Sequence, residues 1–164
     1  MTLRSWSVGA LIAVGLVTAG CGGSDPSAAK PKAPAGAPVT DAEERVIRGW
    51  SDEMRHGRVR AAAKYFSVPS RSVGVPQGGA DLASAREVEE FNDAFPCGAK
   101  LLRVARTAHD LVIADFELTD RPGGDCGASA GTRATFAFLI DSDDHIAQFI
   151  LVEDRDSESE LISA

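Results

Sequence analysis

The stretch TRATFAFLIDSDDHIAQFILV, residues 132–152, decides the fold of this chain. Along Thr132–Ile140 every second residue from Ala134 onward belongs to one apolar row, and His145–Val152 is a second short, mainly apolar segment. Alternation with a period of two is typical of β-strands. Asp141–Asp144 lies between the runs and contains only turn-forming residues. The stretch therefore predicts a hairpin with one apolar row, made of Ala134, Phe136, Phe138 and Ile140.

Two further strands are expected immediately before this hairpin, at Lys100–Thr107 and Leu111–Leu118. Residues 120–131, DRPGGDCGASAG, form the longer loop that connects them to it. Antiparallel strands joined in chain order make a meander. In the second strand Asp115 falls opposite the apolar row of Phe116, so we expect it to face solvent or to pair across strands with Arg103 or Arg133.

Helical patterns precede the strands. Thr40–Glu43 matches a capping box, and the apolar residues after it recur at helical spacing as far as Met54. A second short helix is expected at Val59–Phe66, and a third opens at Ser84 and ends at Pro96. Residues 68–80 contain two prolines and three glycines, which predicts a loop with one short strand. Helices followed by a meander indicate an α+β fold with the helices on one sheet face.

This order of elements resembles the nuclear transport factor 2-like superfamily, over about residues 40–154. The resemblance rests on three segments: VIRGWSDEMRHG (46–57), VRAAAKYF (59–66) and FAFLIDSDDHIAQFILVED (136–154). The superfamily's usual hairpin turn contains Asp-Gly-Lys or Asp-Gly-Arg, whereas this chain has Asp143-Asp144-His145 and lacks the glycine. The resemblance implies a cone-shaped fold, in which about three N-terminal helices pack on a curved antiparallel meander sheet and a hydrophobic pocket opens at the mouth.

Function does not follow from that resemblance. The superfamily includes SnoaL-like cyclases, ketosteroid isomerases and limonene epoxide hydrolases, and it hosts enzymes and non-enzymes alike, so the fold does not determine the activity.

The N-terminus carries an export signal. Arg4 is the only charge in residues 1–20, and an apolar run of about ten residues follows it, too short to span a bilayer. The small residues before Cys21 resemble the lipobox of bacterial lipoproteins, although Thr18 stands where that family prefers Leu. The resemblance implies lipidation of Cys21 and anchoring on the outer, extracytoplasmic face of the cell membrane. The alternative is an ordinary signal peptide with a chance cysteine.

Four parts are therefore expected: a lipoprotein signal peptide (1–20), a lipidated cysteine with a Pro/Ala-rich linker (21–39), the folded domain (40–154) and an acidic tail (155–164). The linker holds four of the eight prolines and shows no apolar periodicity, as a semi-rigid spacer would.

Cys97 and Cys126 remain as an even pair in the exported domain, and we expect them to form a disulfide. The alternative is two free thiols. A metal site is disfavoured because no Cys-x-x-Cys pair and no ligand-like histidine spacing occurs.

The chain has a net charge of −7 and a pI near 4.9, which argues against nucleic-acid binding. No catalytic motif or cofactor-binding sequence is recognisable, so we assign no catalytic residue, cofactor or metal. An isomerase would need a carboxylate base in an apolar pocket and an oxyanion donor, for which Asp115 and the single tyrosine, Tyr65, are the candidates. An epoxide hydrolase would need two carboxylates and an arginine, and Asp115, Arg103 and Arg133 are candidate members of such a group. Candidate pocket residues are Trp50, Tyr65, Phe136 and Phe138, although aromatic residues at such spacing more often form core.

The sequence favours a membrane-anchored envelope lipoprotein whose domain binds a small apolar ligand or another envelope protein without catalysis. Two alternatives stay open: a small hydrolase or isomerase of the ketosteroid isomerase or epoxide hydrolase type, and an accessory structural protein with a filled cone. A second copy of the chain is a further candidate partner, which would form a homodimer through the sheet.

Overall fold

The structure, a computed structural model, describes residues 37–74, 78–107 and 109–152. The signal peptide, Cys21, almost all of the linker and the acidic tail lie outside these residues. None of the helices in the described ranges is long and apolar enough to cross a membrane.

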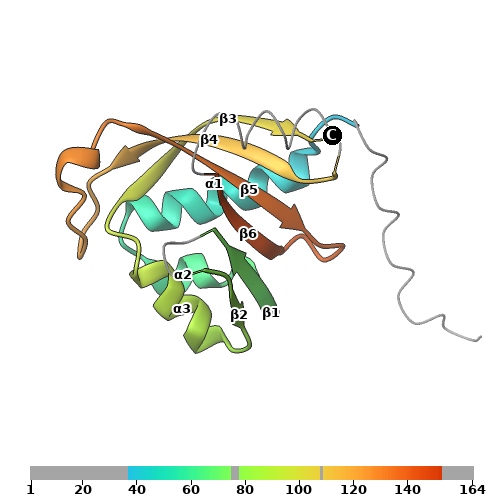
Figure 1. The fold of residues 1–164 in the computed structure, drawn as a ribbon, viewed down its shortest axis with the longest axis horizontal. Coiled ribbons are helices and arrows are strands. Elements are labelled where there is room, and N and C mark those ends of the chain that lie inside the picture. Colours follow the sequence, from blue (N-terminus) through green and yellow to red (C-terminus); the bar gives the residue numbers. More distant parts are fainter. Residues whose placement is uncertain (1–36, 75–77, 108, 153–164) are drawn as a thin grey trace, which may run out of the picture.

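One six-stranded sheet forms the body of the fold, in the order β2-β1-β6-β5-β4-β3 (Figure 1). The strands are β1 (Phe66–Val73), β2 (Ala80–Leu82), β3 (Gly98–Arg106), β4 (Val112–Thr119), β5 (Arg133–Ile140) and β6 (Ile146–Val152). Strands β3 to β6 form the antiparallel meander that the sequence predicts. Strand β1 pairs in parallel with β6, so the whole sheet is mixed rather than purely antiparallel.

The segment around Pro69 differs most from expectation. The second helix, α2 (Val59–Ala63), ends three residues earlier than predicted, and Phe66 already begins β1. Pro69 lies inside this strand, where the pairing with β6 shifts register between Phe66 and Arg71. A proline cannot donate a ladder hydrogen bond and is tolerated at such an irregularity. The buried side chains of β1 after Phe66 are Ser70 and Ser72, so the sequence of this strand shows no apolar alternation.

Three helices cover one face of the sheet. The first, α1 (Asp41–Arg55), has the expected capping box at Thr40 and buries Val46, Ile47, Trp50 and Met54. It packs against β3 and β4, while α2 lies between α1 and α3 (Ala85–Asp93), which approaches β2 (Figure 1). The α+β fold class is thus confirmed.

Aromatic rings dominate the core between the helices and the sheet. All seven phenylalanines and Trp50 belong to one network of ring contacts, and Trp50 alone meets four phenylalanines at centroid distances of 5.5 to 6.2 Å. Most of these pairs are edge-to-face, the arrangement that ring quadrupoles favour. A smaller apolar cluster of Ile113, Ala137 and Val152 lies on the opposite face of the sheet.

The turn between β5 and β6 compensates for its missing glycine. Asp144 adopts a left-handed conformation with φ +61°, which aspartate tolerates better than most residues. The carboxylate of Asp141 accepts hydrogen bonds from the backbone N–H groups of Asp143 and His145, both at 3.0 Å. The predicted hairpin therefore forms without a glycine in its turn.

Candidate ligand-binding cavity

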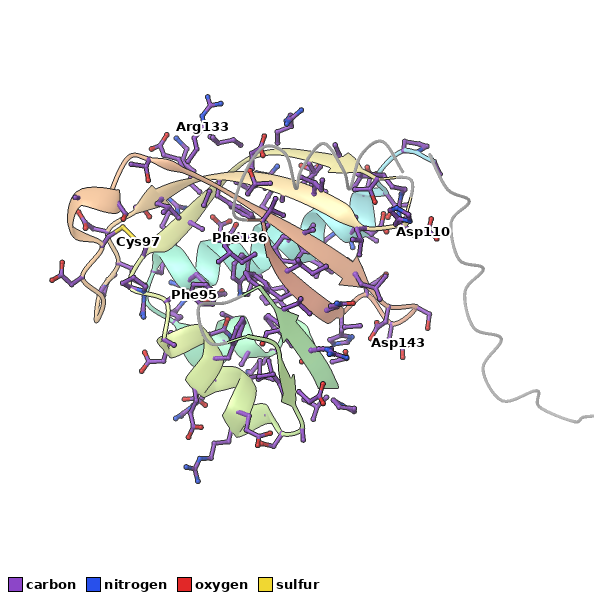
Figure 2. The ribbon with its side chains drawn as sticks, viewed as in Figure 1. Phe95, Cys97, Asp110, Arg133, Phe136 and Asp143 are labelled. Carbon is purple, nitrogen blue, oxygen red and sulfur yellow. A yellow bond between two sulfur atoms is a disulfide. The ribbon has the colours of Figure 1, made fainter. Side chains whose placement is uncertain are left out.

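A cavity of about 870 Å³ lies between α3 and the concave face of the sheet. Its walls are mainly apolar and come from α1, α3 and all six strands. The apolar side chains that line it include Trp50, Met54, Phe91, Phe95, Leu118, Ala134, Phe136 and Leu151. In Figure 2, Phe95 and Phe136 lie in the middle of the molecule between α3 and the sheet, and their centroids are 6.3 Å apart.

Small residues on the sheet side leave this space open. Ala134 on β5 and Ala99 on β3, the strands on either side of β4, line the cavity where larger residues would fill it. On the helix side, Glu87, Glu90, Phe91 and Ala94 all line it. Residues with these three- and four-residue spacings share one face of a helix, so one face of α3 forms a wall of the cavity.

Charged groups reach the cavity only at its exposed edge. The charged residues that line it within the described part of the chain are Asp81, Glu87 and Glu90, all of which are solvent-exposed. Asp81 lies 3.8 Å from Arg71, and Glu90 is bonded by Arg86 at 2.8 Å. Glu87 accepts hydrogen bonds from the N–H of Ala83 at 2.7 Å and the hydroxyl of Ser84 at 3.1 Å.

A disulfide and the hydrogen bonds of a buried arginine hold the C-terminal end of α3, which borders the cavity. Cys97 and Cys126 form a disulfide with an S–S distance of 2.04 Å, as expected from the cysteine pair. Arg121, whose side chain is 2% exposed, donates to the carbonyl oxygen of Phe95 through Nε and to that of Asp93 through Nη2, both at 3.0 Å. This role of Arg121 could not be predicted from the sequence, because the residue lies in a glycine-rich loop without periodicity.

Trp50 is held in place by a second residue that sequence analysis missed. Its indole N–H donates to the side-chain oxygen of Asn92 at 3.0 Å. Asn92 is fully buried on α3, and its Nδ2 has no hydrogen-bond partner among the residues that the structure describes. In an amphipathic helix, an asparagine is ordinarily expected on the polar, exposed face. The inward position of Asn92 could be inferred only from its partner Trp50, which lies on a different helix.

The four candidate pocket residues do not all line one cavity, although Trp50 contacts both Phe136 and Phe138 in the aromatic core. Trp50 and Phe136 line the large cavity, whereas Phe138 is fully buried in the aromatic network and does not line it. Tyr65 lines a separate depression of about 430 Å³ beside α1. Its ring packs so closely on Gly49 that a Cβ atom at that position would overlap it.

Asp115 lies on the face of the sheet opposite the helices, and it does not line the cavity. It forms a salt bridge with Arg103 at 2.8 Å and accepts a hydrogen bond from the hydroxyl of Thr135 at 3.0 Å. Arg133 pairs in register with Glu117, which lies two residues after Asp115 on β4, and not with Asp115 itself. Asp115 and Arg103 therefore meet across strands, but away from the apolar pocket that catalysis would need.

The residues described here contain no group of three or more His, Cys, Asp or Glu side chains that could hold a metal ion. The cavity itself has hydrophobic walls and an edge that carries three acidic residues.

Comparison with solved structures places the fold. The chain is similar to an NTF2-like protein of unknown function from Cytophaga hutchinsonii, with a TM-score of 0.53 and 8% identity over 72% of this chain and 95% of that one. It is also similar to a SnoaL-like protein of unknown function from Burkholderia thailandensis, with a TM-score of 0.51 and 13% identity over 70% and 98% of the two chains.

A third similar structure is that of an enzyme. SalBIII is an epoxide hydrolase/cyclase-like enzyme with a role in pyran ring formation in the polyether salinomycin. It superposes with a TM-score of 0.50 and 13% identity, over 66% of this chain and 88% of that one. No family model and no curated protein matches the sequence. The chain therefore has the cone-shaped fold of the nuclear transport factor 2-like proteins, and at these identities the likeness concerns the fold alone.

Proposed function

We propose that the domain binds a small, mainly apolar ligand in the cavity between α3 and the sheet. The cavity itself carries this proposal: its volume of about 870 Å³ falls in the range of small-molecule sites, and its walls are aromatic and aliphatic. An open cavity of this size also favours a binding protein over an accessory protein with a filled cone.

Binding without turnover is favoured by where the acids lie. An isomerase of this fold needs a carboxylate base inside an apolar pocket, where desolvation and a nearby oxyanion donor tune its chemistry. Here Glu87 and Glu90 stand at the exposed edge and already accept hydrogen bonds from Ser84 and Arg86. Asp115 lies on the other face of the sheet. The enzyme alternative rests on the fold that the chain shares with SalBIII.

The place of action proposed for the domain is the outer face of the cell membrane. Lipidation of Cys21 would attach the chain, and a linker of 18 residues would hold the domain up to about 55 Å away at about 3.1 Å per residue. A ligand or an envelope protein at the membrane surface would then be within its reach.

Intrinsic fluorescence provides a direct test of ligand binding. Trp6→Phe leaves Trp50, a cavity-lining residue, as the only tryptophan. Titration of this chain with a panel of lipids and polyketide-like compounds should give a saturable change in Trp50 fluorescence and a higher melting temperature. An unchanged signal across the panel would leave the accessory-protein alternative in its place.

A filled-cavity variant adds specificity to that test. Ala134→Phe places a ring in the cavity and should abolish the response, because Ala134 lines the wall. Ala105→Phe is the matched control, since Ala105 is paired with Ile113 on the opposite face of the sheet and should respond as before. Turnover of a panel compound that Glu87→Gln or Asp81→Asn abolishes in a folded chain would instead establish the enzyme alternative.

A further inference from the structure

The acidic edge of the cavity lies on two facing elements. Glu87 and Glu90 stand one turn apart on the cavity face of α3, and Asp81 lies on β2. No lysine, arginine or histidine in the described ranges lines this cavity. Among the described residues, the formal charges that line the cavity are therefore all negative.

Neighbouring cations compensate these charges only in part. Arg71 stands 3.8 Å from Asp81, and Arg86 bonds Glu90 at 2.8 Å, but neither arginine lines the cavity. Glu87 forms no salt bridge within the described residues and accepts only from a backbone N–H and a hydroxyl. At least its carboxylate charge remains available to a ligand.

Aromatic rings line the same cavity as these carboxylates. Phe91, adjacent to Glu90 and one turn after Glu87, lines the cavity together with Phe95. The two rings are perpendicular, with centroids 5.1 Å apart. The face of an aromatic ring attracts a positive charge, and a carboxylate beside it adds to that attraction.

We propose that the cavity selects cationic amphiphiles, in which an apolar body carries an amine or quaternary ammonium group, over anionic ones such as fatty acids. The apolar body would occupy the space lined by Trp50, Phe136 and Leu151. The cationic group would remain at the opening, between Phe91 and the carboxylates of Glu87 and Glu90. This inference rests on the proposed function, since it requires that the cavity takes a ligand.

The position of the charges gives the selectivity a recognisable signature. Because Asp81, Glu87 and Glu90 are exposed, added salt should weaken their interaction with a bound head group. Hydrophobic contacts in the interior do not weaken in this way. The preference for a cation should therefore decrease at high salt, while binding of a neutral amphiphile persists.

Three amphiphiles that share a dodecyl chain test the proposal: dodecyltrimethylammonium, dodecyl maltoside and dodecanoate, each below its micellar concentration. They are titrated into the full chain carrying Trp6→Phe, with Trp50 fluorescence as the readout. We expect the cation to bind about tenfold more tightly than dodecanoate at low salt. Equal affinities, or tighter binding of dodecanoate, would overturn the selectivity and leave the proposed function standing. Failure of all three to bind would overturn both.

Charge-neutral variants distinguish the edge from the overall negative charge of the chain. Glu87→Gln/Glu90→Gln removes two carboxylates while keeping a hydrogen-bond acceptor at the start of α3, and it should bring the affinities for cation and anion together. Asp41→Asn/Asp143→Asn changes the net charge equally at sites that do not line the cavity, and it should preserve the difference. A preference that survives the first variant, or that is lost equally in both, would contradict the assignment to these residues.

Discussion

Trp50 on α1 donates its indole N–H to the side-chain oxygen of Asn92 on α3 at 3.0 Å, and less than 2% of either residue is exposed. This bond joins the helix that crosses the sheet to the helix that forms one wall of the cavity. Since Trp50 also lines that cavity, the polar pair fixes both the core and the shape of the candidate site.

Asn92→Leu should therefore destabilise the domain by about 1–3 kcal/mol, because it leaves the buried indole N–H without an acceptor. Urea denaturation of the single variants Asn92→Leu and Trp50→Phe, and of the double variant, measures the coupling between the two residues. The double variant should cost less than the sum of the singles. Strictly additive losses would mean that the bond contributes no stability.

The disulfide should supply a second, separable part of the stability. Cys97 and Cys126 are 29 residues apart, and closing such a loop stabilises by about 3–4 kcal/mol in the chain-entropy model. A reductant should lower the urea midpoint of the wild-type chain accordingly. Cys97→Ala/Cys126→Ala is the control and should be insensitive to reductant. An unchanged wild-type midpoint under reducing conditions would contradict this expectation.

A buried ion pair at the start of α1 should make stability depend on pH. Partial burial of Glu43 opposes its ionisation, but hydrogen bonds from Arg106 and Thr40 outweigh this, so its pKa lies below the usual 4.5. The side chain of Arg106 is 4% exposed. Because the folded-state pKa is lowered, the contribution is fully present above pH 4.5 and is lost as the pH falls through the lower folded-state value.

Glu43→Gln keeps the capping geometry and removes the charge, so it isolates this effect. The difference in unfolding free energy between wild type and variant should be constant near neutral pH and should decrease as the pH falls below about 4.5. Glu53→Gln removes a carboxylate whose pKa is lowered by a hydrogen bond from the exposed Arg58, and its effect should be smaller. A pH-independent difference for Glu43→Gln would contradict the prediction.

Sequence analysis succeeded where one periodicity dominated. The helical stripe around Trp50 corresponds to one-sided burial of α1, and the alternating row of Phe136 and Phe138 faces the main core. Both elements form as predicted. It failed at β1, where the inward residues Ser70 and Ser72 are polar and a proline interrupts the strand. Pairing of β1 with β6 depends on residues some 80 positions apart, and such long-range contacts leave no local pattern.

The candidate site was harder to predict for a similar reason. The aromatic residues indicated a pocket, but the sequence pattern is the same for Trp50, which lines the cavity, and for Phe138, which is buried in the core. Only the tertiary packing shows which of the two lines the cavity. The acidic edge comes from β2 and α3 together, and β2 was not expected as a separate strand. Its charges could not be assigned to one opening without the fold.

The proposed membrane anchor makes a prediction at Cys21. Cys21→Ser removes the thiol that would be acylated, so the chain should accumulate as an uncleaved precursor or leave the membrane fraction. Metabolic labelling with a fatty-acid analogue should mark the wild-type chain and not this variant. Cys97→Ala/Cys126→Ala, which keeps Cys21, should be labelled as the wild type is. An unlabelled wild-type chain would reject lipidation and favour an ordinary signal peptide.

Asp115 provides the sharpest separation between binding and catalysis. Its carboxylate pairs with Arg103 and Thr135 on the face of the sheet away from the cavity. The partly exposed pair should be worth at most about 1 kcal/mol, so Asp115→Asn should reduce stability only slightly. The Trp50 response to ligands should be unchanged, because no atom of the cavity wall is altered. Loss of ligand response or of a measurable turnover in folded Asp115→Asn would show that this face, and not the cavity, carries the function.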